Sequence, residues 1–155
     1  MARALRPALP GVVDDVIAAV QDAVPVYSDL DPTVRQGVLV ALDAFLELCE
    51  GGEPGLPGRD VYLQFGRAER RNGRSLEALL AAYRAGARQA WSGLADAGER
   101  AGLDSRSMYT LAEAIFAFID EISAASAEGH ALEESRVANE LGRHRRRLLE
   151  ALLTD

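Results

Sequence analysis

The feature that most constrains this chain is a helical spacing of apolar residues, which runs through almost all of it while the alternation typical of strands is nearly absent. The longest stretch begins at Asp104 or Ser105, and nothing after it breaks a helix firmly. The pattern continues to about Leu153, which predicts a helix of up to roughly 48 residues. A helix of that length is far above the usual one and indicates a coiled coil or a connector. Its buried face is predicted to contain Leu111, Ile115, Phe118, Ile119 and Ile122.

Four shorter helices are predicted before it, at about residues 11–23, 32–49, 59–72 and 75–101. Asp31 is expected to be the N-cap of the second, with Pro32 at its first position, and Ser75 is expected to cap the fourth. The sequence therefore predicts an all-α bundle of about five helices with a long C-terminal helix. We expect residues 1–128 to form the bundle and 129–155 to extend the last helix as a connector.

The composition limits the partners and the location of the chain. All 17 basic residues are arginine, and the net charge is −7. Because a free-standing nucleic-acid binder is usually basic, we expect no direct contact with nucleic acid. The one cysteine, Cys49, excludes an internal disulfide and is interpreted as a buried, inert thiol. Without a signal peptide or an apolar run of membrane-spanning length, the sequence predicts a cytoplasmic protein that does not contact the membrane.

Most of the chain resembles the N-terminal domain of PucR-type (purine-catabolism-regulator) transcriptional regulators, a group similar to the N-terminal domain of the stressosome protein RsbRD. The resemblance rests on residues 26–32 (Val-Tyr-Ser-Asp-Leu-Asp-Pro), 70–88 (from Arg-Arg-Asn-Gly-Arg-Ser-Leu to Ala-Arg), Trp91, 118–123 (Phe-Ile-Asp-Glu-Ile-Ser) and 145–153 (Arg-Arg-Arg-Leu-Leu-Glu-Ala-Leu-Leu). The block at 70–88 is the most specific of these.

The resemblance implies an all-helical sensory or interaction module, related to the non-haem globin-like domains of stressosome proteins. In such regulators the chain continues into a degenerate GGDEF-like region and a C-terminal helix-turn-helix. Neither fits into the residues left here, so we expect an input domain whose DNA-binding part is missing. The downstream domains of the same regulator are then its expected partners.

Two groups of residues on the third and fourth predicted helices are candidate binding sites. Tyr83, Arg84, Arg88 and Trp91 could bind an effector at the edge of a pocket; alternatively, the aromatic residues belong to the core and the arginines pair with carboxylates on a neighbouring helix. Arg67, Arg70, Arg71 and Arg74 could hold an anion or an acidic partner; alternatively, they only complement the dipole at the end of a helix.

The last part of the long helix contains a candidate dimer seam. Val137, Leu141, His144 and Leu148 recur at a spacing of three and four residues, which is typical of a coiled coil. We therefore expect a homodimer. His130 lies on the same seam, and each histidine is expected to pair with a glutamate one turn away, His130 with Glu134 and His144 with Glu140. The glutamate and histidine spacing of a di-iron bundle and the cysteines of a zinc site are absent, so no metal is predicted.

No residue pattern typical of an enzyme stands out. The chain has no Ser-His-Asp set, glycine-rich phosphate loop or Cys-His pair, and its adjacent acidic residues would diverge on a helix. We therefore expect a non-catalytic signal-input and dimerisation domain without a cofactor, with an unknown small-molecule effector left open. The alternative is a globin-like domain that senses a small molecule or cofactor. A helical-bundle enzyme is the weaker rival.

Overall fold

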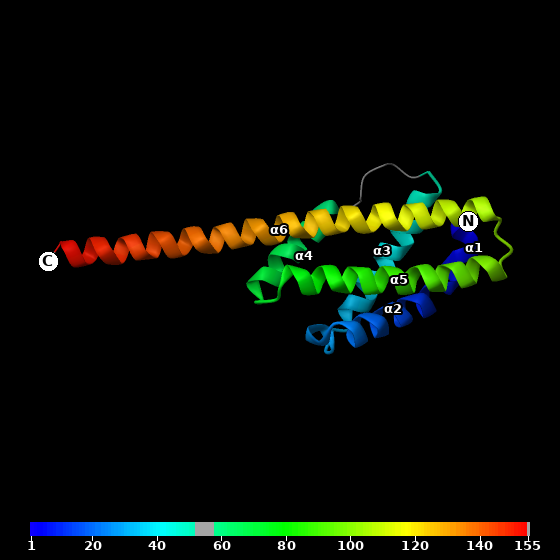
Figure 1. The fold of residues 1–155 in the computed structure, drawn as a ribbon, viewed down its shortest axis with the longest axis horizontal. Coiled ribbons are helices and arrows are strands. Elements are labelled where there is room, and N and C mark those ends of the chain that lie inside the picture. Colours follow the sequence, from blue (N-terminus) through cyan, green and yellow to red (C-terminus); the bar gives the residue numbers. More distant parts are fainter. Residues whose placement is uncertain (52–57, 155) are drawn as a thin grey trace.

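A computed structural model describes residues 1–51 and 58–154 and shows a bundle of helices (Figure 1). In chain order its elements are α1 (Ala2–Leu5), the 3₁₀ turn η1 (Arg6–Ala8), α2 (Leu9–Ala23), the 3₁₀ turn η2 (Pro25–Tyr27), α3 (Thr33–Cys49), α4 (Arg59–Arg71), α5 (Leu76–Arg100) and α6 (Ser105–Leu153). No described residue lies in a strand, so the predicted all-α class is confirmed. The segment between the second and third predicted helices, residues 50–58, lies mostly outside the described residues.

The helix boundaries follow local signals in the sequence. Ser75 Oγ accepts a hydrogen bond from the Ala78 amide at 3.1 Å, and Asp104 Oδ1 accepts one from the Ser107 amide at 2.8 Å, as expected of N-caps. Asp31 Oδ1 accepts from the Thr33 amide at 2.8 Å, although α3 itself begins at Thr33, one residue after the predicted start. A difference of one residue is ordinary at a helix end.

The N-terminus differs from the prediction, because the helical structure begins at Ala2 and α2 begins at Leu9. Ala2, Leu5 and Leu9 are at most 2% exposed, so this segment is part of the core. The sequence prediction began only at residue 11 because Pro7 and Pro10 interrupt the pattern. Both prolines lie within the first two positions of a helical segment, where proline needs no backbone donor.

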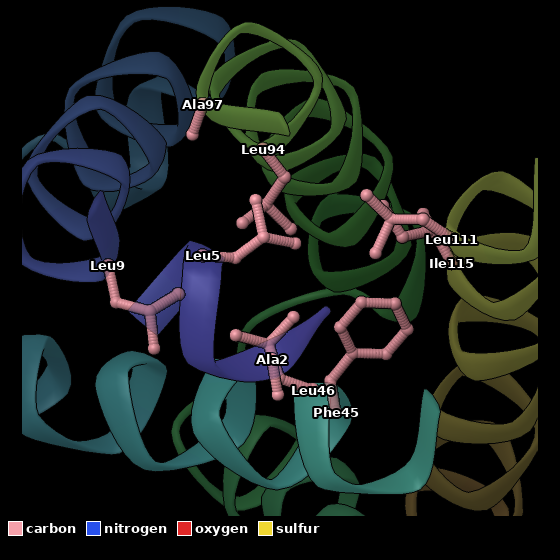
Figure 2. Close-up of a cluster of buried hydrophobic side chains, with 9 residues drawn as sticks. All are labelled: Ala2, Leu5, Leu9, Phe45, Leu46, Leu94, Ala97, Leu111 and Ile115. Carbon is pink, nitrogen blue, oxygen red and sulfur yellow. The ribbon is translucent and has the colours of Figure 1, made fainter. Parts of the chain in front are cut away.

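The largest group of buried side chains joins the first residues of the chain to three long helices (Figure 2). Side chains from the N-terminal segment, α3, α5 and α6 converge there: Ala2, Leu5, Leu9, Phe45, Leu46, Leu94, Ala97, Leu111 and Ile115. The half-buried Trp91 packs against this group, as expected for a core aromatic residue.

The helix α6 runs beside α5 and then projects beyond the bundle (Figure 1). Its last buried residues are Gly129 and Glu133, so the burial reaches past the boundary expected at residue 128. We name residues 134–153 the α6 tail. Within it Val137 is half-buried and the other side chains are exposed. The tail therefore leaves the bundle as a single helix, and its base is where the polar contacts described next are concentrated.

Candidate functional site

The helices α4 and α6 cross with their backbones in contact, next to the base of the tail. Gly66 and Gly129 are both buried at this crossing. A Cβ atom on Gly66 would overlap the carbonyl group of Ser126, and one on Gly129 would overlap the carbonyl group of Leu63. Glycine is therefore required at both positions, which explains a residue that otherwise weakens a helix interior.

Glu133 lies directly after this crossing and has a fully buried side chain. Its Oε2 atom is 3.2 Å from Nε of Arg67 on α4, and its Oε1 atom is 2.6 Å from Nη2 of Arg136 on α6. Arg136 continues the chain of charges to Glu140. The hydrogen bonds from Arg136 and then from Arg67 hold the pKa of Glu133 below its usual value, although burial opposes this. The buried carboxylate is thus charged and joined to both helices.

A second buried carboxylate, Glu69 on α4, binds side chains from two other segments. Arg74 donates to both of its oxygens, from Nε to Oε2 at 2.6 Å and from Nη2 to Oε1 at 2.9 Å. The Tyr27 hydroxyl on η2 donates to Oε2 at 2.5 Å. Burial and the contact with Glu69 raise the pKa of Tyr27 well above its usual value, so the hydroxyl stays a donor. Nε2 of His130 on α6 lies 3.3 Å from the carbonyl oxygen of Arg74.

Ser126 forms a third polar contact inside the bundle. Its Oγ atom donates to the carbonyl oxygen of Tyr62 at 3.1 Å, which leaves the Tyr83 hydroxyl, 2.8 Å from Oγ, as the donor to Ser126. Burial raises the pKa of Tyr83 to about 12. Through these three contacts, α4, α5, η2 and α6 are joined by hydrogen bonds around the base of the tail.

The structure separates the residues that were predicted as one ligand site. Tyr83 belongs to the Ser126 contact, whereas Trp91 packs against the main core. Arg84 and Arg88 are exposed, and no ion pair within residues 1–51 and 58–154 includes either of them, so the expected bridges to carboxylates are not formed.

The predicted basic patch is also divided between two roles. Arg67 and Arg74 bind the buried carboxylates of Glu133 and Glu69. Arg70 and Arg71 lie in the last turn of α4, where cations complement the helix dipole.

The histidine pairs expected on α6 are not present. His130 contacts the Arg74 carbonyl, whereas Glu134 takes part in no ion pair among the described residues. Glu140 pairs with Arg136, and His144 is exposed. His130 and Glu140 therefore contact Arg74 and Arg136 in place of the predicted histidine–glutamate pairs.

Glu69, Ser126 and Glu133 are site residues that were not predicted from the sequence. A signal for two of them exists, because the buried stripe of α6 continues at helical spacing from Ile115 and Ile122 through Ser126 and Glu133. Polar residues in the register of a buried stripe need partners, and this would have pointed to the contacts with α4.

Two hollows on the surface are lined by none of the candidate site residues described above. One, of about 570 Å³, is lined by residues including Cys49, Glu50 and Arg106, and the other, of about 250 Å³, by residues including Asp14 and Arg35. Burial raises the pKa of the Cys49 thiol to about 11, in agreement with its interpretation as inert. Nowhere in the described residues do three metal-ligating side chains come together. Across the same part of the chain, no helix combines the length with the apolar character that crossing a bilayer requires.

Comparison with known proteins gives one match, to the family model described as the PucR-like N-terminal domain, over residues 1–153. No curated protein and no solved structure matches the chain. The matched range includes the N-terminal segment that packs into the core, as well as α4, α5 and the whole of α6 with its tail. The chain therefore belongs to the PucR-like N-terminal domain family.

Proposed function

We propose that this chain is a non-catalytic signal-input and dimerisation domain of a transcriptional regulator, in which the α6 tail pairs with the tail of a second copy. Membership of the PucR-like N-terminal domain family supports the regulatory role. The exposed apolar face of the tail is the observation that carries the pairing. Leu141 is 66% exposed, Leu148 is 54% exposed and Leu152 is 76% exposed.

These leucines lie on one side of the helix. Leu141 and Leu148 are two turns apart, and Leu152 follows one turn later. Val137, Leu141, His144 and Leu148 form the seam, and Leu152 extends it. Most of the stability of a helix in a protein comes from packing of its apolar face, and within one chain this face of the tail is exposed. A second tail would bury the leucines and stabilise the helix.

A parallel pair of tails would serve a regulator well. DNA-reading domains of the helix-turn-helix class bind paired half-sites as dimers. Two tails side by side would hold two downstream domains at one separation and carry a rearrangement of the bundles to both. This chain itself supplies no nucleic-acid contact in this proposal, and its partners are its second copy and the downstream domains of the regulator.

Sedimentation analysis of the full chain tests the pairing. We expect a dimer at tens of micromolar and a weaker one for the double variant Leu141→Glu/Leu148→Glu. The matched control is Ser135→Glu/Asn139→Glu, which adds the same charge one turn apart on the opposite side of the tail and should leave the dimer intact. A monomeric parent chain, or equal dimerisation of both double variants, would contradict the role of the seam.

Native mass spectrometry of the same protein separates this function from small-molecule sensing. We expect the mass of two chains without added mass. A molecule that co-purifies in stoichiometric amount would favour the globin-like sensing alternative.

A further inference from the structure

At the base of the tail, α4 and α6 meet through a backbone contact without side chains and through one buried ion pair. At the crossing of α4 and α6, Gly66 and Gly129 present no side chains that could interlock. Such a contact fixes how closely the helices approach and which faces meet, because a Cβ atom turned into it would clash with the other backbone, but it leaves the tilt of α6 to neighbouring residues. Leu111 and Ile115 hold α6 in the core further along the helix, so the side chains next to the crossing set the direction in which the tail leaves the bundle.

Two ion pairs connect α4 to α6 beside the crossing, and they differ in burial. Arg59 pairs with Glu128 at 2.5 Å, and about half of each side chain is exposed. Arg67 pairs with Glu133, whose side chain is fully buried and is the last buried one on α6. Exposed pairs are weakly held because water and salt screen them. A buried carboxylate, in contrast, loses part of the compensation for its charge when it leaves one of its partners, and Arg67 is the partner of Glu133 on α4.

We propose that the Arg67–Glu133 pair sets the direction of the α6 tail, so that a displacement of α4 is passed to the tail. A continuous set of contacts leads to this pair. Tyr27 on η2 and Arg74 before α5 bind Glu69, which is one turn away from the crossing on α4. A change at the junction of η2 and α5 thus reaches α4 and, through Arg67, the base of the tail. This coupling goes beyond the proposed function, because it acts within one chain whether or not the tails pair.

Pulsed electron paramagnetic resonance on the full chain measures this coupling. Spin labels are attached at Glu77→Cys on α5 and Arg146→Cys on the tail, in a Cys49→Ser background. Labelled protein is diluted with unlabelled protein, so that only distances within one chain are recorded. We expect a narrow distance distribution for the parent.

Arg67→Gln is the decisive variant, because Glu133 keeps Arg136 as a partner and the chain should still fold. We expect its distance distribution to shift or broaden. Two matched controls should retain the parental distribution. Arg136→Gln removes the other partner of Glu133 but leaves the link to α4, and Arg59→Gln removes the exposed pair between the same two helices.

A folded Arg67→Gln variant with the parental distribution would overturn the proposal, and so would an equal broadening in Arg59→Gln. Glu133→Gln is a second test of the proposal, since it keeps the shape of the side chain and removes its charge. Circular dichroism establishes that each variant is folded. A failure of dimerisation in the sedimentation experiment would leave the expected distances within one chain unchanged, so the two proposals fail separately.

Discussion

Two glycines of α6 have different surroundings, and this difference predicts opposite effects of adding a methyl group. At Gly129 the new Cβ atom would meet the Leu63 backbone, which cannot yield as a side chain can. We expect Gly129→Ala to lower the free energy of unfolding by at least about 2 kcal/mol, as overpacking does. At Gly142 no atom lies within 4 Å, so Gly142→Ala should stabilise the tail helix by up to about 1 kcal/mol. Urea unfolding followed by circular dichroism measures both.

The buried Glu133 carboxylate predicts a dependence of stability on pH. Because its pKa is lowered in the folded chain, its contribution is complete above the unfolded pKa, for which the reference is 4.5, and is lost as pH falls through the lower folded value. We expect Glu133→Gln to be less stable than the parent at neutral pH, with a difference that shrinks in acid. Glu134→Gln, at the exposed neighbour, should show no such change. A difference for Glu133→Gln that stays constant between pH 7 and about pH 3 would contradict this.

Single residues were predictable where the signal is local. Ser75 and Asp104 cap their helices through side chains that reach three residues along the chain, and this depends on sequence alone. Glu133 stands beside Glu134, in an acidic pair of the kind that is typical of a solvated helix face. Its burial depends on Arg67, which is 66 positions away in the sequence. Such a partner can be identified only when the packing of the two helices is known.

At the scale of elements, the long helices were predictable and the N-terminal segment was not. The start and the length of α6 agree with its apolar period and with the N-cap at Asp104. The short α1 has only four residues, too few to show a period, and Pro7 lies two residues beyond its end. It is helical because Ala2 and Leu5 are buried in a core made by α3, α5 and α6. Tertiary packing therefore determines this element, and local propensity contributes little.

The crossing of α4 and α6 was likewise beyond sequence reasoning. Each glycine alone suggests only a weakened helix. The role of Gly66 and Gly129 is evident only when α4 and α6 are placed together, because each glycine avoids a clash with the backbone of the other helix. An isolated pattern of small residues does not say which helix will approach it.

At the scale of the whole molecule, the projecting tail predicts an elongated particle. A compact domain of this length has a radius of gyration of about 15 Å. The tail adds a rod of about 30 Å, since each helical residue rises by about 1.5 Å. We expect small-angle X-ray scattering of the Leu141→Glu/Leu148→Glu variant, diluted until it is monomeric, to give a radius of gyration clearly above the compact value. A value near about 15 Å would mean that the tail folds back onto the bundle.

Because α6 is one uninterrupted helix from Ser105 to Leu153, the orientation of its last residues about the helix axis is fixed relative to its first ones. Each residue turns the helix by about 100°, so the orientation of whatever is attached at the tail is defined by the number of residues beyond Glu133. Inserting two residues into the tail would turn that attachment by about 200°, whereas seven residues would return it to within about 20° of its original direction. The effect of changing the length of the tail would then be periodic: an insertion of two full turns would be tolerated, and an insertion of half a turn would not. The rotational orientation at one end of the tail therefore determines the orientation at the other end.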